Sequence, residues 1–283
     1  MRMKLPRWRR VRRRLAAFVA GVVSASAPVV AGDAGPGWTL DFDAAPLGTV
    51  SRERIETLSP APVKWSNGFA TEDGPGRFAI VESPGHGRAL RVLYPRGGVG
   101  PQQTGGQWMA ELPPRDTYLL EYRLRFSADF DWVQGGKLPG LGGGTAPTGG
   151  YFDPDGFTSR YMWRANGRLV VYLYWAGQES SARATGRQYG VDLDCGVVME
   201  RGRDYVLRQR VTLNTPGRPD GVLEVWVDGR PVLRRDDLLF RDAPGKSWQI
   251  DRFFFSTFHG GADASWAPSR DCTVEFDDFR VAP

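Results

Sequence analysis

The sequence predicts an all-β protein folded as a single antiparallel β-jelly roll or sandwich. Short runs of alternating apolar and polar residues recur along the chain, and this period of two is typical of half-buried strands. Clusters of Gly, Pro, Asn and Asp separate the runs, in keeping with 36 Gly and 21 Pro among 283 residues. Because no linker-like break divides the runs, we expect one domain over residues 32–283.

The N-terminal segment predicts export. Residues 1–14 contain eight Lys or Arg residues, and the uncharged, alanine-rich stretch 15–31 ends in a small-residue pattern suited to cleavage near Ala31. Residues 1–31 therefore resemble a signal peptide, and a retained membrane anchor is the weaker interpretation. Cleavage changes the net charge from +5 to −3, which removes the main support for a nucleic-acid partner. We expect a secreted or periplasmic monomer with no stable membrane insertion after cleavage.

The run from Tyr118 to Phe126 illustrates the strand pattern. One face carries only leucines and aromatic residues, whereas the other carries Glu121, Arg123 and Arg125 beside Leu119. This division predicts a strand with one buried face. Comparable strands are expected at residues 78–82, 89–94, 158–164, 168–175, 205–213, 222–227, 252–258 and 273–281.

Two pairing registers are possible for the hairpin around Asn166-Gly167. A two-residue turn would pair Arg160 with Leu173 and mix apolar with polar residues on one face. A three-residue loop with a left-handed Gly167 pairs Arg160 with Tyr172 instead, which separates the two kinds of residue. We favour this register. Its inner face carries Tyr161, Trp163, Leu169, Val171, Leu173 and Trp175, and its polar face carries Thr158, Arg160, Arg164, Tyr172 and Tyr174.

Cys195 and Cys272 are the only cysteines, so an exported protein with this sequence is expected to join them in a disulfide. Two cysteines are too few for a cysteine-based zinc site, and two histidines are too few for a histidine-rich metal site. We therefore expect neither a metal nor a cofactor.

One lysine, Lys137, lies in a segment rich in glycine, Gly-Gly-Lys-Leu-Pro-Gly-Leu at residues 135–141. The segment lacks the Ser or Thr after lysine and the following helix that a phosphate-binding loop requires. It resembles the GGKLPGL signature of polysaccharide lyase family 14, whose members include alginate and glucuronan lyases with a β-jelly-roll fold. Thr158-Ser159-Arg160, Tyr172-Leu173-Tyr174 and residues 258–266 resemble further segments of that family in the same order.

The resemblance implies a set of site residues. Lys137, Arg160, Tyr172 and Tyr174 match the family's activity-linked positions, and the family's serine falls on Thr158, with Ser159 one residue away. Lys137, Tyr172 and Tyr174 are expected to be surface side chains, and Thr158 and Arg160 are expected to face the same cleft. We also expect substrate contacts from Thr158, Ser159, Arg164, Gln134 and His259.

The implied reaction is β-elimination on an acidic, uronate-containing polysaccharide such as alginate or glucuronan. It removes the proton on C5 and expels the oxygen on C4, so it needs charge neutralisation and two proton transfers. Arg160 or Lys137 can pair with the carboxylate, and a tyrosine whose pKa neighbouring cations lower can act as base, with Lys137 as the rival. The alternatives are a noncatalytic carbohydrate-binding module and a glycoside hydrolase, although the polar face lacks a convincing carboxylate pair.

Overall fold

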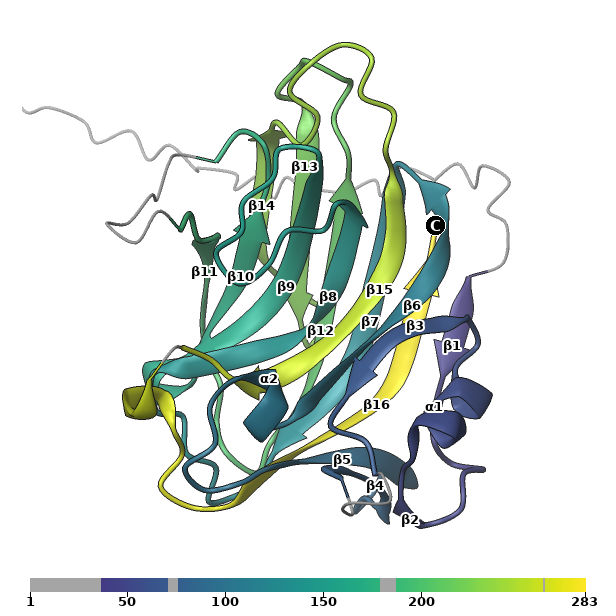
Figure 1. Ribbon diagram of the computed structural model, residues 1–283, viewed down its shortest axis with the longest axis vertical. Coiled ribbons are helices and arrows are strands. Elements are labelled where there is room, and N and C mark those ends of the chain that lie inside the picture. Colours follow the sequence, from purple (N-terminus) through teal and green to yellow (C-terminus); the bar gives the residue numbers. More distant parts are fainter. Residues whose placement is uncertain (1–36, 71–75, 179–186, 262) are drawn as a thin grey trace, which may run out of the picture. The chain divides into compact units, whose positions relative to one another are not determined.

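Two antiparallel sheets pack face to face in the computed structural model, which describes residues 37–70, 76–178, 187–261 and 263–283 (Figure 1). This confirms the predicted all-β sandwich of the jelly-roll type. The predicted signal peptide lies outside the described residues. Within the described ranges, no helix has the length and apolarity needed to cross a membrane.

The larger sheet has nine strands among the described residues. Their order is β14 (Arg230–Leu238), β13 (Gly221–Val227), β12 (Asp204–Thr212), β7 (Thr117–Phe126), β16 (Cys272–Ala282), β5 (Arg88–Tyr94), β4 (Phe78–Glu82) and β2 (Gly48–Thr49), and β1 (Trp38–Leu40) also pairs with β16. Short helices accompany the strands: α1 (Arg52–Leu58), α2 (Gly100–Gln103) and the 3₁₀ turns η1 (Ala165–Gly167) and η2 (Ala264–Trp266).

The smaller sheet has seven strands among the described residues, and it carries the candidate site. Their order is β11 (Val191–Val198), β10 (Arg168–Tyr174), β9 (Gly156–Arg164), β8 (Gly135–Gly144), β15 (Ile250–His259), β6 (Gly106–Arg115) and β3 (Val63–Asn67).

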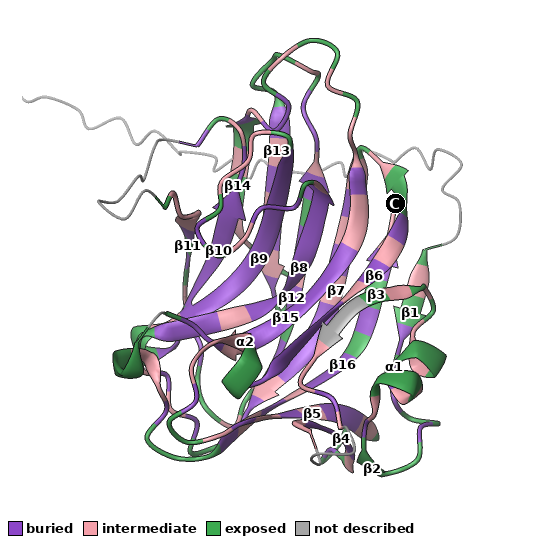
Figure 2. Ribbon diagram, in the orientation of Figure 1, coloured by how far each residue is buried: buried purple, intermediate pink, exposed green. Residues whose placement is uncertain are grey.

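The core lies between the two sheets and is rich in aromatic rings. Trp108 of β6 stacks on Phe255 of β15 at 3.7 Å between ring centroids, and Phe276 of β16 meets Phe255 at 5.1 Å from the opposite sheet. Each such side chain, fully removed from water, contributes about 1.5–3 kcal/mol to stability. Strands β9 and β10 are buried along nearly their whole length (Figure 2). The face of these strands that points away from the core is therefore also covered.

The register predicted for the β9–β10 hairpin is confirmed. Arg160 pairs with Tyr172 and Thr158 with Tyr174, and the connection is the three-residue turn η1. Gly167 has φ +80°, and Asn166 also adopts a left-handed conformation with φ 61°. All six residues predicted for the inner face belong to the main hydrophobic core.

The predicted disulfide is wrong. Cys195 lies on β11 of the seven-stranded sheet and Cys272 on β16 of the nine-stranded sheet, and both are buried free thiols. Burial raises the pKa of Cys195 to about 12 and that of Cys272 to about 11, so both stay protonated at neutral pH. The prediction counted cysteines, whereas pairing depends on the separation of the strands that carry them.

Candidate functional site

The seven-stranded sheet has a face that points away from the core, which we call the outer face. Cross-strand pairing places Lys137 of β8 beside Met162 of β9, and Arg160 beside Tyr172 of β10. Tyr174 follows two residues later on the same face. Met162, Val170, Tyr172 and Tyr174 form a second hydrophobic cluster, separate from the main core. The predicted catalytic residues are therefore brought together on one face.

Lys137 owes its position to an irregularity in β8. The pairing of β8 with β9 shifts register between Lys137 and Gly140, where Pro139 has no backbone N–H to donate. Lys137 Nζ lies 2.7 Å from Met162 Sδ and 3.4 Å from the centroid of the Tyr172 ring. Burial, with repulsion from Arg160 and Arg164, lowers the pKa of Lys137 well below its usual value, and Asp192 partly opposes this. The site therefore makes the neutral amine, which can accept a proton, easier to form than it is in water.

The two tyrosines form a hydrogen-bonded pair. Their hydroxyl oxygens lie 3.3 Å apart, and each accepts a backbone N–H: Gly190 donates to Tyr172 Oη at 3.1 Å, and Gly150 donates to Tyr174 Oη at 2.9 Å. Gly150 lies in the β8–β9 connection and Gly190 directly before β11. These two segments thus cover the pair from outside the sheet.

The covering segments correct two expectations about the tyrosines. Tyr172 is 6% exposed and Tyr174 is fully buried, so they are not surface side chains. Burial and the neighbouring Tyr174 raise the pKa of Tyr172, and the attraction of Arg160 and Arg164 offsets this only in part. The expected lowering of a tyrosine pKa by cations is therefore wrong for Tyr172, which holds its proton and is suited to act as an acid.

Arg160 is a buried cation with few partners. Its side chain crosses β8 at Gly140, and its guanidinium lies 5.0 Å from the Phe254 ring of β15. NH1 donates to Ser256 Oγ at 3.4 Å, whereas Nε and NH2 are buried without a hydrogen-bond partner. A buried charge without an anion is costly, so these two unpaired donors indicate a place for an anionic ligand.

Arg164 lies on the predicted face but already has a carboxylate partner. Its Nε and NH2 donate to the two carboxylate oxygens of Asp192, at 2.8 and 2.5 Å. Its guanidinium also lies 5.6 Å from the Tyr172 ring centroid. Substrate contact by Arg164 would compete with Asp192, and it stays a prediction.

Two predicted substrate contacts are wrong because their side chains face the core. Ser159 donates to Gln209 Oε1 of the opposite sheet at 2.6 Å. His259 is fully buried, lies 2.8 Å from the Asp131 carbonyl oxygen through Nε2, and stacks on Phe130. Burial lowers the pKa of His259 to about 4, so it is neutral at pH 7. Both residues follow an outward-facing neighbour, and successive side chains of a strand alternate between faces.

The other two predicted contacts have partners within the chain. Thr158 faces outward, but its hydroxyl donates to the Pro147 carbonyl at 2.9 Å, beneath the β8–β9 connection. Gln134 is exposed and donates to Ser265 Oγ at 2.6 Å, which ties the start of β8 to η2. Their role in substrate binding stays a prediction.

Sequence reasoning missed several outer-face residues. Met162 could have been found, since it follows Arg160 by two residues on the same strand. Ser256 donates to Gln107 Oε1 at 3.0 Å beside Arg160, but Gln107 belongs to β6, which was not predicted. Asp192 belongs to β11, which was not predicted either.

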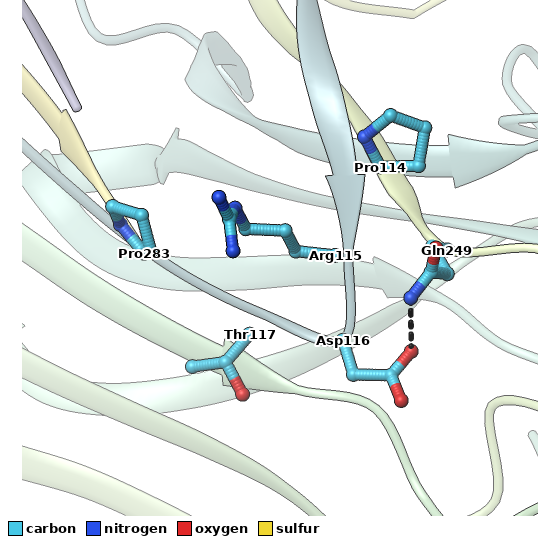
Figure 3. A pocket seen from close by; sticks show the side chains of 6 residues that line it. All are labelled: Pro114, Arg115, Asp116, Thr117, Gln249 and Pro283. Atoms are coloured by element: carbon cyan, nitrogen blue, oxygen red, sulfur yellow. Dashed lines mark hydrogen bonds between the residues drawn. The ribbon is translucent and has the colours of Figure 1, made fainter. Parts of the chain in front are cut away.

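One hollow on the surface does not coincide with these residues. It measures about 350 Å³ and lies at the β6–β7 turn, lined by Pro114, Arg115, Asp116, Thr117, Gln249 and Pro283 (Figure 3). Asp116 accepts hydrogen bonds there from Gln249 at 3.1 Å and Arg241 at 3.0 Å. The Asp116 carboxylate is already hydrogen-bonded, and the hollow contains none of the predicted catalytic residues. We therefore assign the chemistry to the outer face of the seven-stranded sheet.

Comparison with known proteins gives one matching family, described as Polysaccharide lyase 14, over residues 82–279. No curated protein is detectably similar to the chain. Among solved structures, the marine PL-14 alginate lyase from Aplysia kurodai is 25% identical with a TM-score of 0.69, covering 86% of this chain and 97% of that one.

Two further structures are similar. Alginate lyase Aly36B is 22% identical with a TM-score of 0.71, covering 87% of this chain and 96% of that one. Variants of Aly36B with a lysine and either a tyrosine or a methionine replaced by alanine were solved in complex with alginate oligosaccharides. The endo-β-1,4-glucuronan lyase from Trichoderma reesei is 12% identical with a TM-score of 0.52, covering 84% and 94% of the two chains.

Proposed function

Because the chain belongs to polysaccharide lyase family 14, we propose that it cleaves a uronate-containing polysaccharide, alginate or glucuronan, by β-elimination at the outer face of its seven-stranded sheet. The observation that carries this proposal is Arg160, which is 2% exposed and has two buried donor nitrogens without acceptors beside Lys137 and the tyrosine pair. The structural neighbours named as alginate and glucuronan lyases support the same substrate class.

Arg160 is proposed to bind the uronate carboxylate. Removing the C5 proton spreads negative charge onto that carboxylate, and a guanidinium already fixed in a site shielded from water stabilises the charge without reorganising. The arginine is held by the Phe254 ring and Ser256, so its two free donors keep one orientation.

Lys137 is proposed as the base and the tyrosine pair as the acid. The neutral amine takes the C5 proton, the C5–H electrons form the C4–C5 double bond, and the C4–O4 bond breaks. A tyrosine hydroxyl gives its proton to O4, and transfer back from the Lys137 ammonium to the phenolate restores the resting state. The directions of the pKa shifts of Lys137 and Tyr172 support these roles.

The two alternatives fit the site less well. A glycoside hydrolase needs two carboxyl groups across the scissile bond. Among the described residues that contact Lys137, Arg160, Arg164 or the tyrosines, the carboxylate is that of Asp192, and Arg164 occupies both its oxygens. A binding module needs neither a neutral amine nor a tyrosine pair held by two backbone N–H groups.

We also propose that residues 1–31 direct export and are removed, so that the lyase acts outside the cytoplasm. The run of basic residues followed by an uncharged alanine-rich stretch supports this. Mass measurement of the N-terminus of the exported protein tests it, and an intact Met1 in the exported fraction would contradict it.

The function is tested with a panel of polyuronates, following ultraviolet absorbance of the unsaturated product. The wild type should release product from alginate or glucuronan. Lys137→Ala and Tyr172→Phe should each lower turnover by about 10²–10⁴-fold, because each removes a proton-transfer group. Lys64→Ala is the matched control, since Lys64 lies on β3 of the same sheet and pairs with Glu111 on the surface. Near-normal product release from both site variants would contradict the proposal.

A further inference from the structure

Asp192 lies on the edge strand of the seven-stranded sheet, next to the candidate site. Strand β11 ends the seven-stranded sheet beside β10 (Figure 1), and Asp192 pairs directly with Tyr172 across the two strands. Its carboxylate is 29% exposed and accepts both bonds of the Arg164 fork. Such a planar two-bond pair holds both side chains in one orientation.

The pair reaches the proposed base through one aromatic ring. Arg164 lies 5.6 Å from the Tyr172 centroid and Lys137 lies 3.4 Å from it. The aromatic ring attracts the Arg164 guanidinium and contacts the Lys137 amine, so the orientation of Arg164 affects where Tyr172 and Lys137 lie. Asp192, Arg164, Tyr172 and Lys137 thus form a continuous chain of contacts across four strands.

The charges around Lys137 come from two strands. Strand β9 contributes Arg160 and Arg164, and β11 contributes Asp192. Strand β10 contributes Tyr172 and, next to it, Tyr174, both uncharged when protonated. On β15 the residue opposite Lys137 is Phe258, which does not titrate. Among these described neighbours, Asp192 is the negative charge that balances the two arginines.

We propose that Asp192 is a positioning residue: through its ion pair with Arg164 it holds Tyr172 and Lys137 in place and determines the lowest pH at which Lys137 acts as base. This inference rests on the proposed function. Without the Asp192 charge, Arg160 and Arg164 repel the Lys137 proton unopposed, so the amine becomes neutral at lower pH. It also becomes a weaker base, so the rate at the pH optimum falls.

The test compares Asp192→Asn with Asp194→Asn. Asp194 lies two residues along β11 on the same face and pairs with Arg168 at 2.8 Å, but it faces Val170 rather than Tyr172. In Asp192→Asn, the acid limb of the pH profile of kcat/KM should move to lower pH by about one unit. In Asp194→Asn and in the charge-preserving Asp192→Glu, it should stay near the wild-type position.

An NMR titration of the Lys137 side chain gives the same comparison without turnover. The midpoint should be lower in Asp192→Asn than in the wild type and unchanged in Asp194→Asn. Equal midpoints in the wild type and Asp192→Asn, or equal shifts in both asparagine variants, would overturn the inference. A wild type that releases no unsaturated product from any polyuronate would count against the proposed function alone, and the titration would still decide the role of Asp192.

Discussion

Two buried arginines, one on the outer face of each sheet, differ in what surrounds them. Arg123 of β7 is 4% exposed and donates to Asp277 at 2.8 Å, Asp204 at 3.1 Å and Asp278 at 3.4 Å. Arg160 of β9 is 2% exposed and has one long hydrogen bond to an uncharged serine. The nine-stranded sheet therefore neutralises its buried cation within the chain, whereas the seven-stranded sheet leaves a buried cation for an anion from outside.

The surroundings of the two arginines extend this difference. The outer face of the nine-stranded sheet carries further cross-strand ion pairs: Arg208 with Glu121, Arg91 with Glu275, and Arg234 with Glu224. Exposed pairs of this kind contribute little to stability, about 0–1 kcal/mol each. They do supply a carboxylate for each of these three arginines, whereas Arg160 on the other sheet has none.

The largest expected effects come from exchanging each arginine for a methionine of similar length. Arg160→Met should lower turnover by about 10²–10³-fold, because it removes the group that stabilises the developing charge. It should leave the free energy of unfolding unchanged or slightly higher, since it removes an uncompensated buried charge.

Arg123→Met should show the reverse. It leaves Asp277 buried without its partner and should lower the free energy of unfolding by about 3–5 kcal/mol, with normal turnover per folded molecule. Denaturant unfolding and product release on both variants provide the measurement. A strong loss of stability in Arg160→Met, or of intrinsic turnover in Arg123→Met, would break the distinction between the two faces.

A smaller effect concerns the pH dependence of stability on the nine-stranded sheet. Burial raises the pKa of Asp277 to about 6 despite the bond from Arg123. A carboxyl whose pKa is higher in the folded than in the unfolded state binds its proton more tightly when folded. Its contribution to stability is therefore full below about pH 4 and is lost as the pH rises through 6, by up to about 2–3 kcal/mol.

The contribution of His259, on the seven-stranded sheet, to stability changes with pH in the opposite direction. Its pKa is lowered to about 4, so its contribution is lost as the pH falls from about 6.5 to 4. The Asp277→Asn variant separates the effects of Asp277 and His259, because it removes the first titrating group and keeps the second. Relative to the wild type, its free energy of unfolding should rise as the pH goes from 4 to 6. Denaturant unfolding across this range measures the difference, and a difference that does not change with pH would show that Asp277 titrates normally.

Strict alternation made much of the fold predictable. Strand β4 matches its predicted range of 78–82, and the separation of apolar from polar residues was enough to choose the β9–β10 register. That register alone brings Arg160, Tyr172 and Tyr174 to one face. Strand β8 contains mostly glycine and shows no alternation, so Lys137 was found through the family resemblance.

The remaining features depend on contacts that periodicity does not describe. Strand β11 is an exception, because Val191, Leu193 and Cys195 alternate with Asp192 and Asp194, and this period of two would have located Asp192. The burial of the tyrosines depends on Gly150 and Gly190 in the covering segments, which have no regular pattern. Ser159 and His259 were misplaced because a motif names consecutive residues, whereas a strand sends them to opposite faces.

The central claim is that the unpaired cation of the seven-stranded sheet belongs to an elimination site. Mass analysis of the oligosaccharides released from alginate or glucuronan in water enriched in oxygen-18 tests it most directly. Elimination adds no water, so the products should be unsaturated, one water lighter than hydrolysis products and free of oxygen-18 at the new ends. Saturated products carrying oxygen-18 would indicate a hydrolase, and polymers that bind but stay intact would indicate a binding module; either result would contradict the account.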